Sequence, residues 1–227
     1  QGRWGQRLRT RFVLGIPWGT VLGIGVVIAV YLFVQGGLAH RFDPVSLPFR
    51  ATSYAYPLGV LLAGFAHLNW SHLLGNLLSG LVFGSIAEYA WSHYPTGRGA
   101  QSFETWLDNP YGRIGLFFGA ILVTGLLTAA FSWGPIIGFS GVVFALAGFA
   151  LVFYPIATIV AVVGWGHLWH GWSAFVDPYT IAEPAIRYSD VAFANTAVQG
   201  HAFGFLIGVL AAALLVRSRN RSASPGR

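Results

Sequence analysis

Residues 134–155 read GPIIGFSGVVFALAGFALVFYP, and this stretch decides how the rest of the chain is interpreted. The residues after Ser140 are almost all apolar and Pro155 ends the run, which predicts a helix from Ser140 to about Tyr154. Such a helix is roughly 22 Å long at about 1.5 Å per residue, whereas the hydrocarbon core of a bilayer is about 30 Å thick. If Pro155 marks one membrane surface, Ser140 lies several ångströms below the other. The irregular stretch before it must then line a polar cavity, because lipid does not tolerate irregular backbone.

The composition of the chain is that of a polytopic membrane protein. Of its 227 residues, 55% are hydrophobic and 9% are charged, whereas a soluble domain usually carries about 25% charged residues. One membrane domain fits this length. The chain has no cysteine, which excludes a disulfide, a Cys-ligated zinc site and a thiol nucleophile within it.

Six apolar segments are predicted as membrane-spanning helices. They run approximately over Trp18–Val34, Trp70–Trp91, Ile114–Phe131, Ser140–Tyr154, Ile156–Trp172 and Val198–Val216. We therefore expect an all-α membrane protein built as a bundle of six transmembrane helices. Its expected organisation is a basic N-terminal segment at 1–16, a membrane domain at 17–217 and a polar basic tail at 218–227.

The arginines predict how this bundle is oriented. Lysine is absent, so the 13 basic residues are all arginine. Two clusters flank the first and last segments: Arg3, Arg7, Arg9, Arg11, Arg217, Arg219, Arg221 and Arg227. Positively charged flanks stay in the cytoplasm, so both termini are expected there, which requires an even number of spans. This distribution, rather than a nucleic-acid partner, accounts for the net charge of +6.

The second segment carries polar groups at helical spacing. His72 and Asn76 are four residues apart and share a helix face, and the same row continues through Gly80 and Gly84 to Glu88. Polar residues inside a membrane are costly and indicate a functional site, while small residues let another helix approach closely. Taken alone, the polar pair is equally explained by hydrogen bonds to neighbouring helices.

The fourth and sixth segments carry a serine and a histidine that could meet. Ser140 follows Gly138 at the start of its helix, where backbone N–H groups without helical partners can stabilise a developing oxyanion. His201 lies near the outer end of the sixth segment, with Gly204 and Gly208 forming a GxxxG ridge on roughly the same face. If this ridge packs on the helix after Ser140, the two side chains come together. Taken singly, each could instead bond to nearby backbone.

His167 and His170 form a further polar pair, near the end of the fifth segment. A zinc site needs at least three protein ligands; His67 is a conceivable third, but the sequence contains no HExxH. We interpret the pair as interfacial histidines among tryptophans, and no metal is expected.

Taken together, these motifs resemble those of the rhomboid family of intramembrane proteases, over about 58–215. The stretch from His67 to Asn76 is similar to the family's HxxxxHxxxN segment, and Gly138–Gly141 is similar to its GxSG motif. The stretch Gly200–Gly208 is similar to its AHxxGxxxG motif. The three motifs occur in the family's order, each on the expected helix.

The resemblance implies a role for each reactive residue. Ser140 would be the nucleophile and His201 the general base, a dyad without an acid. His72 and Asn76, with the backbone N–H groups of Ser140 and Phe139, would form the oxyanion hole. Packing around the site would involve Gly138, Gly141, Phe144, Gly204 and Gly208. The implied reaction needs no cofactor, and the implied partners are transmembrane protein substrates within the lipid bilayer.

The chain departs from the family pattern at three places. Phe144 stands where the family commonly has a tyrosine that stacks on the histidine, so the stacking face is kept and the hydroxyl is lost. The stretch Tyr56–Val60 lacks the Trp-Arg pair that many rhomboids carry before the second helix. The loop Ser173–Asn195 is longer than expected and is placed where it could affect access to the site.

Two other readings of the sequence compete with the protease. A non-catalytic rhomboid-like protein that binds membrane segments usually lacks the serine or the histidine, and both are present here. A transporter or channel predicts inverted repeats or several charges in mid-membrane, and neither is visible. The compact six-span form favours the plasma membrane of a prokaryote, with a membrane of a eukaryotic organelle as the alternative.

Overall fold

The computed structural model describes residues 14–40, 43–51, 56–91, 109–132, 136–164 and 198–222. The regular secondary structure of this part is helical, apart from one isolated β-bridge between Ala51 and Ile136. Its elements in chain order are α2 (Trp18–Ala29), the π-helical turn η2 (Val30–Val34), the 3-10 turn η3 (Leu47–Phe49), α3 (Pro57–Leu62), α4 (Trp70–Trp91), α5 (Pro110–Phe131), α6 (Ser140–Phe153), a helix at Pro155–Gly164, and α9 (Val198–Ser222). The predicted all-α fold is confirmed for these residues.

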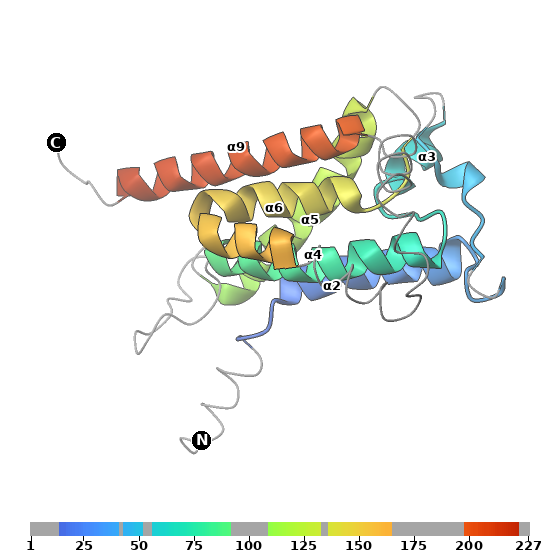
Figure 1. The fold of residues 1–227 in the computed structure, drawn as a ribbon, viewed down its shortest axis with the longest axis horizontal. Helices are drawn as coiled ribbons and strands as arrows, with labels where there is room; N and C mark the ends of the chain where they lie inside the picture. Colours follow the sequence, from blue (N-terminus) through green and yellow to red (C-terminus); the bar gives the residue numbers. More distant parts are fainter. Residues whose placement is uncertain are drawn as a thin grey trace, which may run out of the picture.

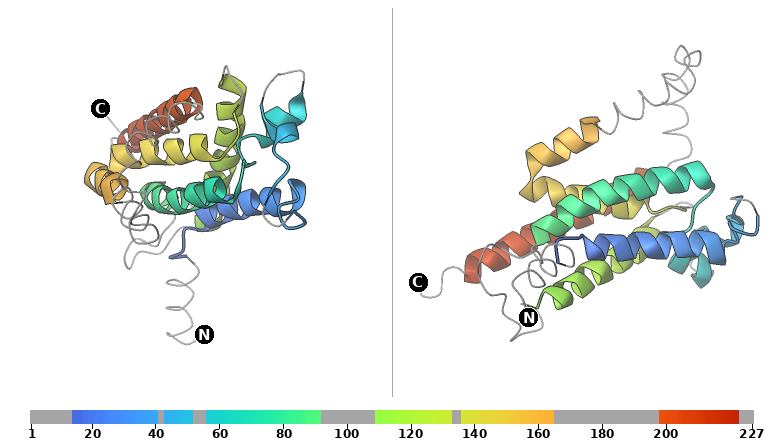
Figure 2. Two further views of the ribbon diagram at one scale, coloured as in Figure 1. Left: turned by 45° about the vertical axis from the view of Figure 1, so that its right-hand side comes forward. Right: turned by 90° about the horizontal axis from the view of Figure 1, so that it is seen from below.

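The long helices lie side by side in a bundle (Figure 1). α6 lies between α9 and α4 and makes its most extensive contact with α9. α2 packs against both α5 and α4, which completes the other side of the bundle (Figure 2). The middle position of α6 explains why its residues Val142, Val143, Leu146 and Phe149 are buried in the main hydrophobic core.

Three described helices are long and apolar enough to cross a membrane, namely Trp70–Trp91, Pro110–Phe131 and Gln199–Asn220. Three further apolar helices are shorter: Trp18–Val34, Ser140–Phe153 and Pro155–Gly164. α6 has 14 residues, which corresponds to about 21 Å. The short helix that begins at Ser140 is therefore present as predicted.

α5 begins at Pro110, four residues before the predicted start at Ile114, and the end of α9 also differs from the sequence-based expectation. α9 continues to Ser222 instead of ending near Val216. Arg219 explains the extension, because its guanidinium donates hydrogen bonds to the carbonyl oxygens of Ala90 and Trp91 at 3.1 and 3.2 Å. Carbonyl groups in the last turn of a helix generally lack intrahelical partners, and Arg219 supplies donors to these two. The arginine that was expected only as a cytoplasmic charge thus also caps a neighbouring helix.

Parts of the predicted organisation lie outside the described residues. The fifth segment is described as far as Gly164, so His167 and His170 are beyond it. The N-terminal basic cluster and the loop Ser173–Asn195 also lie outside the described part.

Glu88 ties α4 to the N-terminus of α2. Its carboxylate accepts hydrogen bonds from the backbone N–H groups of Gly19 and Thr20, both at 2.8 Å, and from the Thr20 hydroxyl at 2.7 Å. These N–H groups begin α2 and lack helical partners, and the helix dipole favours a carboxylate there. One turn earlier, a Cβ at Gly84 would lie 2.5 Å from Thr20 Cγ2, so the small residue permits the contact.

Glycines set how closely α9 approaches α6. A Cβ at Gly204 would collide with the carbonyl oxygen of Gly141, and a Cβ at Gly208 would collide with that of Ala145. Any larger residue at these positions would push the helices apart. The GxxxG ridge of α9 therefore lies against α6, which holds the first turns of α9 beside Ser140.

Candidate active site

Ser140 and His201 are hydrogen-bonded to each other. Ser140 is the first residue of α6, and His201 lies in the first turn of α9. The distance between His201 Nε2 and Ser140 Oγ is 2.7 Å. Two side chains 61 residues apart in sequence thus form the nucleophile–base geometry that serine hydrolases use.

Phe144 holds the ring of His201 from α6. The two ring centres are 4.3 Å apart and the ring planes differ by 13°, which is a stacked arrangement. Phe144 lies one turn after Ser140, so serine and aromatic ring share a helix face. The imidazole of His201 is therefore oriented by stacking on Phe144 and by the hydrogen bond between its Nε2 and the Ser140 hydroxyl.

The backbone before Ser140 is pinned by two segments. The Ala51 N–H donates to the Ile136 carbonyl at 3.0 Å, and the Gly138 N–H donates to the Ala63 carbonyl at 2.8 Å. Gly138 has a φ of 127°, a conformation that side chains with a Cβ rarely adopt. These contacts fix where the extended stretch stops and where α6 begins at Ser140.

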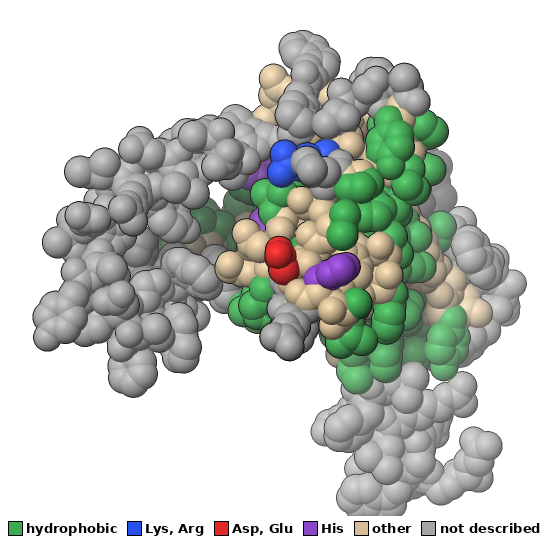
Figure 3. Space-filling view, turned by 90° about the vertical axis from the view of Figure 1, so that its right-hand side faces the viewer, with side chains coloured by type: hydrophobic (Ala, Val, Ile, Leu, Met, Phe, Trp, Pro, Cys, Tyr) green, Lys and Arg blue, Asp and Glu red, His purple; other side chains and the backbone are tan. Residues whose placement is uncertain are grey.

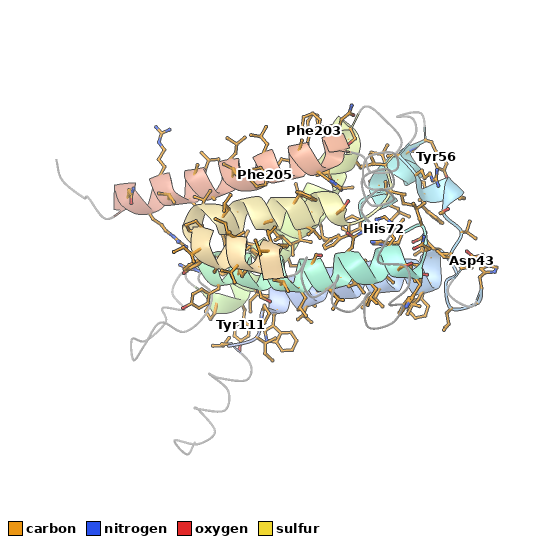
Figure 4. All side chains as sticks on the ribbon, in the orientation of Figure 1. Asp43, Tyr56, His72, Tyr111, Phe203 and Phe205 are labelled. Carbon is orange, nitrogen blue, oxygen red and sulfur yellow. The ribbon has the colours of Figure 1, made fainter. Side chains whose placement is uncertain are left out.

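His72 and Asn76 lie directly behind Gly138. A Cβ at Gly138 would be 2.7 Å from His72 Cε1 and 3.5 Å from Asn76 Nδ2. Figure 4 shows His72 on α4, near the end of the bundle where α3 lies. Within the described residues, His72 Nδ1 is buried without a hydrogen-bond partner. The two polar side chains of α4 therefore converge on the backbone that leads into Ser140.

His67 and Gln35 belong to the same cluster, and sequence reasoning missed this. His67 Nε2 lies 3.0 Å from Asn76 Nδ2, and Gln35 bonds to both the N–H and the carbonyl of His67. Burial is the main cause that lowers the pKa of His67 to about 3, with the nearby ring of His72 adding to it. The sequence places His67 in the HxxxxHxxxN-like segment and makes it a conceivable third metal ligand, but it indicates no role for His67 beside Asn76. Gln35 gave no signal beyond being a polar residue at the end of an apolar segment.

The expected site residues are brought together with one difference of orientation. Phe139 is 1% exposed and packs its ring near Phe65, with ring centres 6.3 Å apart. Its backbone N–H donates to His67 Nε2 at 3.5 Å, whereas it was expected to help bind the oxyanion. Among the residues that the structure describes, no group of three or more His, Cys, Asp or Glu side chains could hold a metal ion.

The site lies towards the same end of the bundle as α3. Figure 3 views the molecule from this end and shows a few charged and histidine side chains set among hydrophobic ones. His40 and Asp43 are exposed in the loop that follows η2. In this view hydrophobic side chains gather along the right-hand edge of the described part (Figure 3).

Comparison with known proteins gives two matches. A family model described as the rhomboid domain matches residues 56–218, which include both Ser140 and His201. The chain is also similar to "Rhomboid-like protein 11, chloroplastic" from Arabidopsis thaliana, with 27% identity over 135 residues. This match covers 54% of the chain and 45% of that protein, so it spans less than half of the relative's length. No solved structure gives a significant match.

Proposed function

This chain belongs to the rhomboid family, and on that premise we propose that it is an intramembrane serine endopeptidase that cleaves transmembrane segments of membrane proteins. The observation that carries the proposal is the 2.7 Å contact between Ser140 Oγ and His201 Nε2, with Phe144 stacked on the imidazole. A histidine at this distance can take the serine proton and so make the hydroxyl nucleophilic.

The proposed reaction proceeds through an acyl-enzyme. Ser140 Oγ attacks the scissile carbonyl while His201 Nε2 accepts the hydroxyl proton. The tetrahedral intermediate collapses, His201 passes the proton to the leaving amine, and the ester on Ser140 remains. Water, activated by the same histidine, then hydrolyses the ester and restores the hydroxyl. The stacked Phe144 ring takes over part of the orienting role that an acidic residue has in a triad.

The proposed oxyanion hole consists of His72, Asn76 and the backbone N–H of Ser140. The convergence of the two α4 side chains behind Gly138 supports this assignment. The N–H of Phe139 was expected to join them, but it is directed at His67 Nε2 at 3.5 Å. We therefore leave the Phe139 N–H out of the proposed oxyanion hole in this conformation. It would join the hole in a complex in which the substrate turns the Phe139 peptide towards the oxyanion.

The proposed membrane arrangement has six spans with both termini in the cytoplasm, and the site near the outer surface. The start of α2 and the end of α9 lie at the same end of the bundle, which supports this topology (Figure 1). The membrane domain at 17–217 with its basic flanks is retained as the proposed organisation. The plasma membrane of a prokaryote is the proposed location; the similar Arabidopsis protein is described as chloroplastic, and fractionation of the source organism distinguishes the two.

The alternative is a rhomboid-like protein that binds membrane segments without cleaving them. The named relative carries the words "rhomboid-like", whereas the intact serine–histidine contact favours catalysis. A fluorophosphonate probe separates the two proposals, because it reacts with activated serines. We expect the parent protein to be labelled and Ser140→Ala to be unlabelled. Equal labelling of both would contradict the assignment of Ser140 as the nucleophile.

A further inference from the structure

His67 is fully buried just before α4, with 0% of its surface exposed. Its Nδ1 lies 3.1 Å from the carbonyl oxygen of Phe65. A carbonyl can only accept, so Nδ1 must carry the proton. Because the ring is buried and neutral, Nε2 carries no proton and can only accept a hydrogen bond. The Phe65 carbonyl, in the turn before α4, therefore fixes the tautomer of the His67 ring.

The unprotonated Nε2 of His67 fixes the orientation of the Asn76 amide. Asn76 Nδ2 lies 3.0 Å from His67 Nε2. Since Nε2 accepts, the NH2 group of Asn76 must be the donor, and the amide cannot be flipped. One of its two hydrogens is used in this bond. The other hydrogen remains available on the side of Gly138. A Cβ at Gly138 would lie 3.5 Å from Asn76 Nδ2.

Gln35 holds His67 in place from the end of η2. It is 1% exposed, and its Oε1 accepts from the His67 N–H at 2.7 Å while its Nε2 donates to the His67 carbonyl at 2.8 Å. The same Nε2 also donates to the Val45 carbonyl at 3.0 Å, and the Val45 N–H returns a bond to the Gln35 carbonyl at 2.9 Å. One buried glutamine thus connects the loop after η2 to the turn that carries His67.

We infer that Gln35 and His67 are positioning residues that hold the Asn76 amide with one N–H directed towards the oxyanion formed at Ser140. The inference rests on the proposed protease function and deepens it. It makes the paired bonds between Gln35 and Val45 part of the positioning network, because a shift of Gln35 moves the backbone of His67 and with it the donor on Asn76. An oxyanion-hole donor is effective only when it is already aimed at the developing charge.

Two substitutions of His67 that differ by one methylene test the inference. In His67→Gln, the side-chain oxygen can take the place of Nε2 and accept from Asn76. In His67→Asn, the shorter side chain can replace Nδ1–H but cannot reach Asn76. With a transmembrane substrate in liposomes, we expect His67→Asn to lower kcat about tenfold or more with little change in KM, because removing an oxyanion donor costs about 10²–10³ in kcat. His67→Gln is expected to keep most of the activity.

A double-mutant comparison separates positioning from simple destabilisation. If His67 acts through Asn76, then His67→Asn combined with Asn76→Ala should be no slower than Asn76→Ala alone. Gln35→Leu should likewise lower kcat in the parent and leave it unchanged in the Asn76→Ala background. Multiplicative losses, or equal losses in His67→Gln and His67→Asn, would overturn the inference. A failure of the proposed function looks different: either the parent does not hydrolyse the substrate or Ser140→Ala still does.

If the chain proves not to hydrolyse the substrate, a measurement independent of catalysis still tests whether His67 holds Asn76. Histidine labelled with 15N reports the tautomer of each of the 7 histidines, and the signal of His67 is identified by its loss in His67→Gln. At pH 7 we expect a neutral ring protonated at Nδ1, with an Nε2 resonance that shifts in Asn76→Ala and stays in place in Gly115→Ala. A ring protonated at Nε2, or an Nε2 resonance that ignores Asn76→Ala, would overturn it.

Discussion

Gly204 of α9 lies against the backbone carbonyl of Gly141 on α6, so closely that no Cβ fits between the two helices. Gly141 follows Ser140 and Gly204 is one turn after His201. The contact between these two glycines therefore sets the distance at which the serine and the histidine meet. The geometry of the proposed dyad therefore depends on helix packing as much as on the reactive groups themselves.

Gly204→Ala should lower activity about 100-fold and lower stability. The added methyl would collide with the Gly141 carbonyl, and a displacement of about 1 Å at a reacting centre can cost about 100-fold in rate. Gly115→Ala is the matched control, because within the described structure nothing lies within 4 Å of its built Cβ. Fluorophosphonate labelling and the thermal midpoint in detergent measure the two effects. Wild-type labelling of Gly204→Ala would contradict the packing argument.

Phe144→Leu should weaken catalysis, whereas Phe144→Tyr should preserve it. Leucine removes the ring that stacks on His201 at 4.3 Å, while tyrosine keeps it. Aromatic pairs contribute about 0.5–1.5 kcal/mol beyond their buried area, which corresponds to a loss of about 2- to 13-fold in kcat. Steady-state kinetics of the two variants provide the check. If leucine and phenylalanine give the same kcat, stacking does not hold the imidazole.

Glu88→Gln should destabilise the bundle without touching the active site. The carboxylate accepts three hydrogen bonds at the start of α2, and an amide turns one of its two acceptors into a donor that faces an N–H. We expect a loss of about 1–3 kcal/mol in the free energy of unfolding. Thr20→Val, which removes only the hydroxyl bond, should cost less. Unfolding curves in detergent compare the two, and a larger loss for Thr20→Val would refute this account of Glu88.

His67 should make the protein less stable in acid. Its pKa is about 3 in the folded protein against an ordinary 6.5. Above pH 6.5 the ring is neutral in both states, so it adds no pH dependence. Between pH 6.5 and 3 the unfolded chain binds a proton that the folded protein does not, and the free energy of unfolding falls by about 1.4 kcal/mol per pH unit.

The comparison of His67→Gln with the parent isolates this contribution. The parent should lose stability more steeply between pH 6.5 and 4 than the variant, because glutamine does not titrate. Unfolding measured at several pH values gives the two slopes. Parallel slopes would show that His67 titrates alike in the folded and unfolded protein, which would contradict its burial as a neutral ring.

Much of the fold could be read from the sequence, because membrane helices have a strong signal. The apolar run after Ser140, ended by Pro155, predicted the short α6 within one residue of its end at Phe153. The spacing of His72 and Asn76 predicted one shared helix face, and the glycines after His201 predicted a close helix contact. Each of these patterns is local in sequence and follows from helix geometry.

The remaining features depend on contacts between distant segments, which leave no periodic pattern. The buried position of Gln35 follows from its bonds to a turn that is 32 residues away. The extension of α9 to Ser222 follows from carbonyls at the end of α4, which Arg219 caps. The direction of the Phe139 N–H follows from the positive φ of Gly138 and from the place of His67. None of these could be derived before the helices were packed.

Cleavage of a fluorogenic single-span substrate in liposomes tests the central claim most directly. The parent, Ser140→Ala and His201→Ala would be assayed together, with folding checked by the thermal midpoint of each. The account predicts hydrolysis by the parent and its loss in both folded variants. Hydrolysis that survives in Ser140→Ala would contradict the serine mechanism.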